Sequence, residues 1–239
     1  MKEIELLQKM INESKNIVFF GGAGVSTDSG IRDFRGKNGL YKMKNNTNHS
    51  PEYMLSSSCL YNEPELFFDY YRNYMDASDA KPNVTHLYLK KLEDDGKLKA
   101  IVTQNIDGLH QKAGSKKVLE IHGTTMRNYC DKCGKEYPSD YIFKSNGIPK
   151  CKCGGLIRPD VTLYGEMLPD AFSEAQYYIY KADLLIVAGT SLTVEPASSL
   201  VRLFNGKHLV IINGSETPYD SIAELVIHKK LKDVFSKLR

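Results

Sequence analysis

Four polar residues near the middle of the chain are of the types that do acid–base chemistry or bind sugars. Gln104, Asn105 and Asp107 come directly after one apolar stretch, and His122 comes directly after another. Histidine titrates near neutral pH and is the usual general base, while amides and a carboxylate can hydrogen-bond a ribose, a carboxamide or an ordered water. Each residue has a structural alternative, because Asn105 or Asp107 could cap a helix and a single histidine is more often structural than catalytic.

The cysteines have the spacing of a metal site. Cys130 and Cys133 form one close pair, and Cys151 and Cys153 form a second pair after 17 intervening residues. Such pairs are typical of a structural zinc ribbon, a closed site with no position for water, although most ribbons have C-x-x-C where this chain has C-x-C. The metal would hold a lobe too small for its own core; four unrelated buried thiols are the alternative. Cys59 stands alone, and an odd count without an export signal argues against a disulfide framework.

A glycine-rich segment near the N-terminus has the form of a diphosphate-binding loop. Residues 16–20 are apolar and largely β-branched or aromatic, which predicts a buried strand. The chain then turns on three glycines, Gly21, Gly22 and Gly24. Capping residues from 26 to 29 predict a helix start, where unpaired N–H groups and the helix dipole favour an anion. An ordinary loop is the alternative, and Thr27 occupies the third position of the G-x-G-x-x-G fingerprint.

The elements that must position these residues alternate between strand and helix patterns. Strands are predicted at residues 16–20, 100–103, 118–121, 183–188, 208–212 and 223–227. Helices are predicted at residues 1–15, 63–75, 83–92 and 170–181, from Pro196 onward and at the Lys-rich C-terminus. This alternation predicts an α/β fold with a doubly wound parallel sheet. Polar residues follow five of the strands, and the carboxyl ends of parallel strands form one edge, where ligands bind.

Six motifs in order between Gly21 and Asn213 resemble those of the sirtuins, the NAD-dependent protein deacylases. They are GAGVSTDSGIRDFRG, TQNIDGLHQKAG, the HG pair at His122, the cysteine quartet, RPDVTLYGEMLP and GTSLTVEP. The resemblance implies a Rossmann-like doubly wound sheet with a small zinc-ribbon and helical lobe. The chain departs from the family at Arg32, where proline is usual, and at Tyr164, where phenylalanine is usual.

The resemblance also implies a reaction, in which NAD is the co-substrate and O-acyl-ADP-ribose, nicotinamide and free lysine are the products. His122 is the implied base, and Asn105 is the second implied catalytic residue. The implied cofactor-binding residues are Gly22, Ala23, Gly24, Thr27, Asp33, Phe34, Arg35, Gln104, Asn105, Ile106, Asp107, His122, Gly189, Thr190, Ser191 and Asn213. A substrate peptide would add as a strand and contact Thr162, Leu163, Tyr164, Gly165, Thr193 and Val194. The implied ligands of one structural zinc ion are Cys130, Cys133, Cys151 and Cys153.

The expected domain division follows from these motifs. Residues 1–36, 77–126 and 159–239 form the Rossmann-like domain, and residues 37–76 and 127–158 form the small domain. A chain of 239 residues with 41% hydrophobic residues suffices for one sizeable core and a small second module. The net charge of +3 is too small to indicate nucleic acid, and no signal peptide or membrane span is apparent. We therefore expect a cytoplasmic protein whose partners are acyl-lysine proteins or peptides, with no membrane or nucleic acid.

Two rival functions use the same cofactor. One is a mono-ADP-ribosyltransferase with a different nucleophile, and the other is a non-catalytic sensor of NAD or ADP-ribose, against which His122 and Asn105 argue. The family resemblance also bears on acyl choice, because sirtuins that prefer succinyl- or malonyl-lysine have a tyrosine and an arginine three positions apart near residues 63–75. Here Asp69 lies three positions before Arg72, which predicts that acetyl-lysine is favoured over succinyl-lysine.

Overall fold

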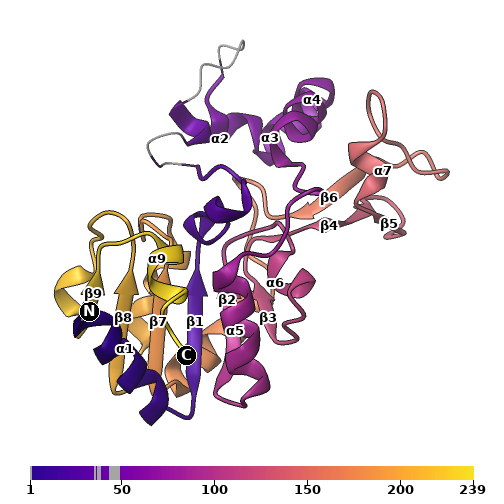
Figure 1. Cartoon of the computed structure of the whole chain (residues 1–239). Helices are drawn as coiled ribbons and strands as arrows, with labels where there is room; N and C mark the ends of the chain where they lie inside the picture. The colour runs from indigo at the N-terminus through magenta and orange to yellow at the C-terminus, as the bar shows by residue number, and fades with distance from the viewer. Residues whose placement is uncertain (1, 35, 37–38, 43–48) are drawn as a thin grey trace.

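The computed structural model describes residues 2–34, 36, 39–42 and 49–239. Within this part of the chain, a six-stranded parallel sheet with the order β3-β2-β1-β7-β8-β9 forms the body of the molecule (Figure 1). Its strands are β1 (Ile17–Gly21), β2 (Leu98–Thr103), β3 (Val118–Glu120), β7 (Leu184–Ala188), β8 (His208–Ile212) and β9 (Leu225–Ile227). The chain moves outward from β1 to β3 and returns to β7 on the other side of β1. The predicted doubly wound parallel sheet is confirmed.

Helices cover both faces of this sheet. Successive side chains of a strand point to opposite faces, so neighbouring strand residues pack in different cores. Phe19 packs in a core with α1 (Lys2–Glu13), α5 (Val84–Asp94) and α9 (Leu231–Phe235). Its neighbour Phe20 packs in a second core with α8 (Ala171–Lys181) and the 3₁₀ helix Ala197–Leu203. Burial on both faces explains why these strands are continuous apolar runs in the sequence.

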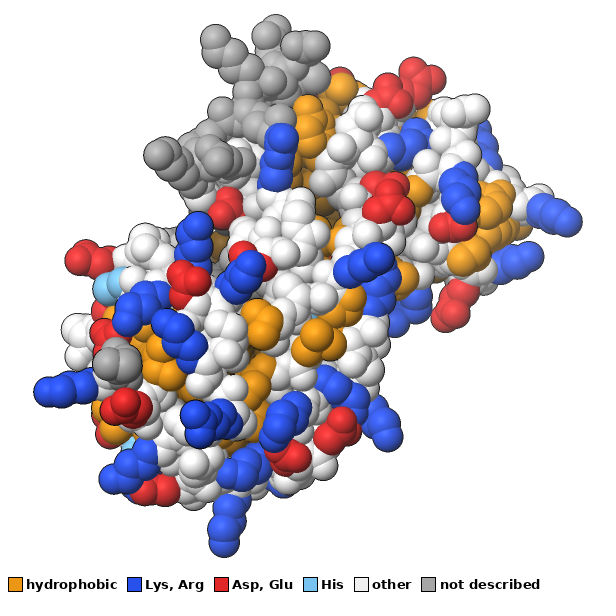
Figure 2. All heavy atoms as spheres, viewed as in Figure 1, with side chains coloured by type: hydrophobic (Ala, Val, Ile, Leu, Met, Phe, Trp, Pro, Cys, Tyr) orange, Lys and Arg blue, Asp and Glu red, His pale blue; other side chains and the backbone are white. Residues whose placement is uncertain are grey.

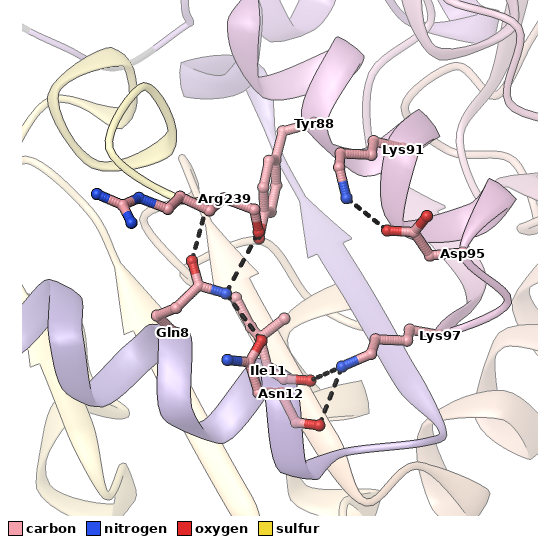
Figure 3. A network of polar contacts seen from close by, with 8 residues as sticks. All are labelled: Gln8, Ile11, Asn12, Tyr88, Lys91, Asp95, Lys97 and Arg239. Carbon is pink, nitrogen blue, oxygen red and sulfur yellow. Dashed lines mark hydrogen bonds and ion pairs between the residues drawn. The ribbon is translucent and has the colours of Figure 1, made fainter.

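Hydrogen bonds fasten the amino-terminal edge of the sheet (Figure 3). Lys97 Nζ donates to the carbonyl oxygens of Ile11 at 2.9 Å and Asn12 at 3.0 Å, at the carboxyl end of α1, where a cation is favoured. The N–H of Arg239, the last residue, donates to Gln8 Oε1 at 2.7 Å. Lys97 directly precedes β2, and α1 leads into β1. The Lys97 contacts therefore lie near the amino ends of these two strands, opposite the polar strand ends.

A small lobe lies beyond the carboxyl ends of the parallel strands, at the top of Figure 1. Its described residues include an antiparallel sheet of order β5-β4-β6, formed by β4 (Gly123–Cys130), β5 (Glu136–Pro138) and β6 (Ile157–Val161). They also include the helices α2 (Pro51–Met54), α3 (Ser57–Asn62), α4 (Pro64–Met75) and α7 (Asp140–Phe143), and the 3₁₀ helix Leu40–Lys42. The core of the lobe includes Phe67 and Phe68 of α4 and Ile142 of α7. Strands β4 and β6 run across the boundaries expected at 126/127 and 158/159, and the division into two domains stays a prediction.

Two segments expected to begin α-helices form 3₁₀ structure instead. After β1 the chain makes two short 3₁₀ turns, Ala23–Val25 and Thr27–Ser29, which end at Gly30 with a φ of 86°. The segment after Pro196 is 3₁₀ throughout. The first deviation has a physical reason, because this segment bonds to neighbouring elements, as where the Gly24 N–H donates to the Gly189 carbonyl oxygen at 2.8 Å.

The surface of the described residues carries mixed charge. Figure 2 shows Lys and Arg side chains interspersed with Asp and Glu on the visible face, with no single basic block there. None of the helices in the described ranges has the length and apolar character that crossing a membrane requires.

Candidate active site

A cavity of about 860 Å³ lies between the carboxyl ends of the parallel strands and the small lobe. Most of the expected cofactor-binding residues line it: Gly22, Ala23, Gly24, Asp33, Phe34, Gln104, Asn105, Ile106, Asp107, His122, Gly189, Thr190, Ser191 and Asn213. Five of the expected peptide-binding residues line it as well: Thr162, Leu163, Tyr164, Gly165 and Val194. The loops that follow β1, β2, β3, β7 and β8 therefore meet at one site, as the positions of their polar residues predict.

Close backbone approach explains two of the glycines at this site. A Cβ on Gly24 would lie 2.8 Å from the Gly189 Cα, so the loops after β1 and β7 could not meet if residue 24 had a side chain. Gly123, directly after His122, has a φ of 75°, and a Cβ there would lie 2.2 Å from the Asp160 carbonyl oxygen. A side chain at either position would push apart segments that line the cavity.

Ser26 joins the loop after β1 to the segment after β2. Its hydroxyl donates to Asp107 Oδ2 at 2.6 Å and accepts from Asn105 Nδ2 at 3.1 Å. The N–H of Leu109, which begins α6 (Leu109–Lys112), donates to Asp107 Oδ1 at 2.9 Å. Asp107 thus accepts from the first turn of α6, which is the capping role considered as its alternative, and it also lines the cavity. Burial raises the pKa of the Asp107 carboxyl, and the hydrogen bonds from Ser26 and Leu109 oppose that rise.

His122 lies in the turn between β3 and β4, and its Nδ1 is 3.1 Å from the carbonyl oxygen of Gln104. A carbonyl oxygen only accepts hydrogen bonds, so the proton of the neutral imidazole is on Nδ1 and Nε2 keeps its lone pair. Burial lowers the pKa of His122, and the bond to Gln104 opposes this effect. At pH 7 the ring is therefore neutral, with Nε2 in the state that a general base requires.

Gln104 also connects two strand ends through its side chain. Its Nε2 donates to Thr190 Oγ1 at 3.1 Å, and the same oxygen accepts from the N–H of Leu192 at 3.2 Å. The backbone of Gln104 holds His122, and its side chain holds the loop after β7. One residue thus fixes two walls of the cavity relative to each other.

A buried ion pair shapes the segment expected to bind a peptide. Arg158 in β6 is 6% exposed, and both of its Nη atoms donate to the Glu166 carboxylate. Glu166 Oε2 also accepts from the N–H of Leu163 at 2.9 Å. On one side, the Tyr164 N–H donates to the Leu55 carbonyl oxygen at 3.0 Å. The Arg158–Glu166 ion pair therefore holds residues 162–166 through the Leu163 N–H, and the small lobe holds them through Leu55.

The Tyr164 hydroxyl connects this segment to the loop on the other side of the cavity. It forms a 2.5 Å hydrogen bond with the Tyr41 hydroxyl. The Tyr41 N–H donates to the Phe34 carbonyl oxygen at 2.9 Å, and the two rings meet edge to face with centroids 5.6 Å apart. A phenylalanine at position 164 could not make the hydroxyl contact.

Two of the expected contact residues do not line the cavity, and a third is not among the described residues. Thr27 does not line it, and its hydroxyl donates to the Gly24 carbonyl oxygen at 2.9 Å. Thr193 does not line it either, and its hydroxyl bonds the Ser191 hydroxyl at 2.8 Å. Arg35 lies outside the described residues. Ligand contacts by these three residues stay predictions.

Helix α4 presents aromatic side chains to the cavity through Tyr71 and Tyr74. Arg72 points elsewhere: its Nε donates to the Ile142 carbonyl oxygen at 3.0 Å, and its Nη2 donates to Ser145 Oγ at 2.9 Å. The guanidinium therefore fastens α4 to the α7 segment. Burial of an acyl carboxylate needs a paired cation, and α4 does not direct this one into the cavity.

The four clustered cysteines have the geometry of a metal site. Their Sγ atoms all lie within 4.8 Å of one another, and four thiolates at such distances suit tetrahedral zinc. The Tyr137 hydroxyl donates to Cys151 Sγ at 3.0 Å, which gives one sulfur a second contact that orients it. Cys59, the fifth cysteine, is buried in the core of the small lobe.

Ser26 and Tyr41 are site residues that the motifs do not indicate by themselves. Ser26 lies inside the first motif, but the sequence analysis gives it no role beyond a helix start; its place two residues after Gly24 is a signal that could have found it. Tyr41 follows Gly36 in an irregular polar stretch, where no periodicity assigns a direction to a side chain.

The sequence is similar to known proteins over almost its whole length. The model of the Sir2 family matches residues 22–196. An NAD-dependent protein deacetylase from Clostridium acetobutylicum is 54% identical over 98% of this chain and 97% of its own length. Another from Staphylococcus aureus is 45% identical over 99% of this chain and 98% of its own length.

Solved structures agree with the sequence matches. A Sir2 complex with a deacetylated p53 peptide and 3′-O-acetyl ADP-ribose is 40% identical, with a TM-score of 0.90 over 98% of this chain and 96% of that one. A complex of Sir2, a p53 peptide and NAD⁺ is 41% identical, with a TM-score of 0.86 over 99% and 97% of the two chains. Sir2Tm bound to a propionylated peptide is 40% identical, with a TM-score of 0.87 over 99% and 97%.

Proposed function

This chain belongs to the Sir2 family, and on that premise we propose that it is an NAD-dependent protein-lysine deacylase. The reaction consumes NAD, an acyl-lysine and one water molecule, releases nicotinamide and free lysine, and leaves the acyl group on ADP-ribose. The observation that carries the proposal is a neutral histidine, His122, whose Nε2 is available as a base in the same cavity as the polar ends of five strands. The relatives that are 45% and 54% identical to this chain are named NAD-dependent protein deacetylases, which supports it.

NAD, when bound, supplies the ribose carbon from which nicotinamide leaves and to which the acyl oxygen becomes attached. We assign the diphosphate to the glycine-rich loop at residues 22–24, because its backbone can approach an anion closely. We assign the nicotinamide end to Asn105 and Asp107, which Ser26 holds together. The adenosine half is assigned to Thr190, Ser191 and Asn213.

His122 accepts a proton at Nε2 from a ribose hydroxyl, which can then attack the carbon of the acyl group. The buried environment that lowers the pKa of His122 also keeps the ring unprotonated at neutral pH. Residues of both the sheet loops and the small lobe line this cavity, so groups reacting there would be enclosed. Exclusion of bulk water protects a reactive intermediate.

The substrate class is an acyl-lysine side chain in a protein or peptide. Solved relatives hold p53 peptides or a propionylated peptide, and residues 162–165 line the same cavity as the assigned cofactor residues in this chain. We place the peptide as an added strand between residues 162–165 and 193–194, where main-chain hydrogen bonds would give affinity. The acyl-lysine would then point toward His122.

The four cysteines would hold one structural zinc ion, which stabilises the small lobe and takes no part in the chemistry. We also propose that the protein acts in the cytoplasm, on soluble protein substrates rather than at a membrane or on nucleic acid. The mixed charge of the face visible in Figure 2 supports only the part about nucleic acid and acidic membranes, because that face has no basic block.

Release of nicotinamide, measured with and without an acetylated peptide, distinguishes the proposal from its rivals. A deacylase releases nicotinamide only with the acylated peptide, in equal amount to the deacylated product. A mono-ADP-ribosyltransferase would release nicotinamide with the unacylated peptide and leave ADP-ribose on protein. A sensor would bind NAD and release nothing.

The role of His122 as the base is tested by the same replacement, histidine to glutamine, at two positions. His122→Gln should lower kcat by at least about 100-fold, the usual contribution of a general base, and leave the calorimetric affinity for NAD within about twofold. His110→Gln is the matched control, because His110 is buried and does not line the cavity. Near-normal deacylation by His122→Gln would remove this residue from the mechanism.

A further inference from the structure

Asn83 is the residue before α5, and it contacts the back of the loop that follows β1. Its Nδ2 donates to the Val25 carbonyl oxygen at 2.8 Å and to Ser29 Oγ at 2.9 Å. These two residues flank Ser26, which faces the cavity and holds Asp107. Asn83, Val25 and Ser29 do not line the cavity themselves.

The other polar groups of Asn83 are fixed by its own helix. Its Oδ1 accepts from the N–H of Thr85 at 2.9 Å, and its backbone N–H donates to His86 Nδ1 at 3.2 Å, which completes a capping box. With its oxygen in the helix cap, the amide can rotate only by losing the cap. The two N–H bonds of the amide are thereby directed at the loop.

Other contacts fix the loop on its remaining sides: Ser26 bonds Asp107 and Asn105, and Val25 is buried in the core with Phe19. On the β7 side, the Gly22 N–H donates to the Ala188 carbonyl oxygen at 3.2 Å and the Gly24 N–H to that of Gly189 at 2.8 Å. On the α5 side, Val25 O and Ser29 Oγ both accept hydrogen bonds from Asn83 Nδ2. Short 3₁₀ turns have poor internal hydrogen-bond geometry, so the loop needs such contacts from outside.

We propose that Asn83 is a positioning residue for NAD binding: it clamps the 22–30 loop to the N-terminus of α5 and so holds Ser26 where it can fix Asp107. The kinetic test of this inference rests on the proposed function, because it measures the KM for NAD during deacylation. The inference concerns a residue that touches neither the cofactor nor the substrate, and it predicts a defect in NAD binding rather than in the chemical step.

Asn83→Ser is the informative variant, because serine is an equally good N-cap but is too short and lacks the amide donors for the loop. Loss of two ordinary hydrogen bonds should raise the KM for NAD by about tenfold, with kcat and the peptide KM within about twofold. Asn83→Asp retains a cap but places a carboxylate against the Val25 carbonyl, so it should raise the KM for NAD at least as much. Ser29→Ala removes one of the two bonds and should have an intermediate effect.

Hydrogen exchange of the ligand-free protein gives a readout that does not depend on catalysis. Amides in residues 22–30 should exchange faster in Asn83→Ser, while those of α5 exchange as in the wild type. Asn12→Ser is the matched control, because Asn12 lies in α1 at the opposite edge of the sheet (Figure 3), and it should leave both readouts unchanged.

The inference is overturned if Asn83→Ser keeps both the wild-type KM for NAD and the wild-type exchange of residues 22–30. If the melting temperature nevertheless falls, Asn83 is a helix cap only. Failure of the proposed function looks different, because the wild-type protein would then not release nicotinamide with an acetylated peptide. The exchange measurement would still decide whether Asn83 clamps the loop.

Discussion

Two buried histidines should make the protein unstable in mild acid. His86 in α5 and His110 in α6 face each other with ring centroids 4.7 Å apart, and they are 0% and 1% exposed. Among the described residues, neither nitrogen of His110 and only Nδ1 of His86 has a hydrogen-bond partner. Burial lowers the pKa of His86 to about 4, and burial together with the nearby His86 lowers that of His110 to about 3.

The sign of the effect follows from these shifts. Each imidazole is neutral in the folded protein, whereas in the unfolded chain it gains a proton below its ordinary pKa of 6.5. Protonation therefore favours the unfolded chain, and stability present above pH 6.5 is lost as pH falls toward the folded pKa values. Between pH 8 and pH 5 each histidine should remove about 2 kcal/mol, and the pair about 4 kcal/mol. This is a large fraction of the roughly 5–15 kcal/mol that stabilises a typical domain.

Urea unfolding, followed by circular dichroism at pH 8, 6.5 and 5, measures this loss. Glutamine is the replacement of choice because it does not titrate, and at His86 it can also complete the capping box. Each of His86→Gln and His110→Gln should reduce the pH-dependent loss by about 2 kcal/mol relative to wild type, whatever its effect at pH 8. Other titrating groups, including the cysteines, are common to all variants and cancel in this difference. An unchanged pH dependence in both variants would refute the reasoning.

Two further predictions concern the metal and the acyl group. Purified protein should contain one zinc ion per chain by elemental analysis. A strong chelator or Cys130→Ser should remove the zinc and unfold the small lobe, whereas Cys59→Ala should retain the zinc. A metal-free protein with full activity would show that the site is not structural. The ratio of kcat/KM for acetyl- and succinyl-lysine versions of one peptide should favour acetyl, because Arg72 is bonded to the Ile142 carbonyl oxygen instead of facing the cavity; faster desuccinylation would contradict this.

The strands and their polar ends could be predicted because they depend on local patterns. The run from Ile17 to Phe20 is apolar at every position, since both faces of the sheet are covered. A parallel sheet then brings the residues after each strand to one edge, so Asn105, His122 and Thr190 could be assigned to one site before any distance was known. The cysteine spacing likewise limits how the four thiols can meet.

Side-chain directions at the cavity could not be predicted in the same way, because they depend on partners far away in the sequence. Arg72 and Tyr71 are neighbours on α4, and the periodicity of the helix allows either to face the cavity. The α7 segment decides between them, since it offers carbonyl and hydroxyl acceptors to the guanidinium and leaves Tyr71 to line the site. Ser26 is a similar case, because its role depends on an aspartate 81 positions later. Motifs therefore identify which segments meet, and the polar groups around each segment determine which of its side chains reach the ligand.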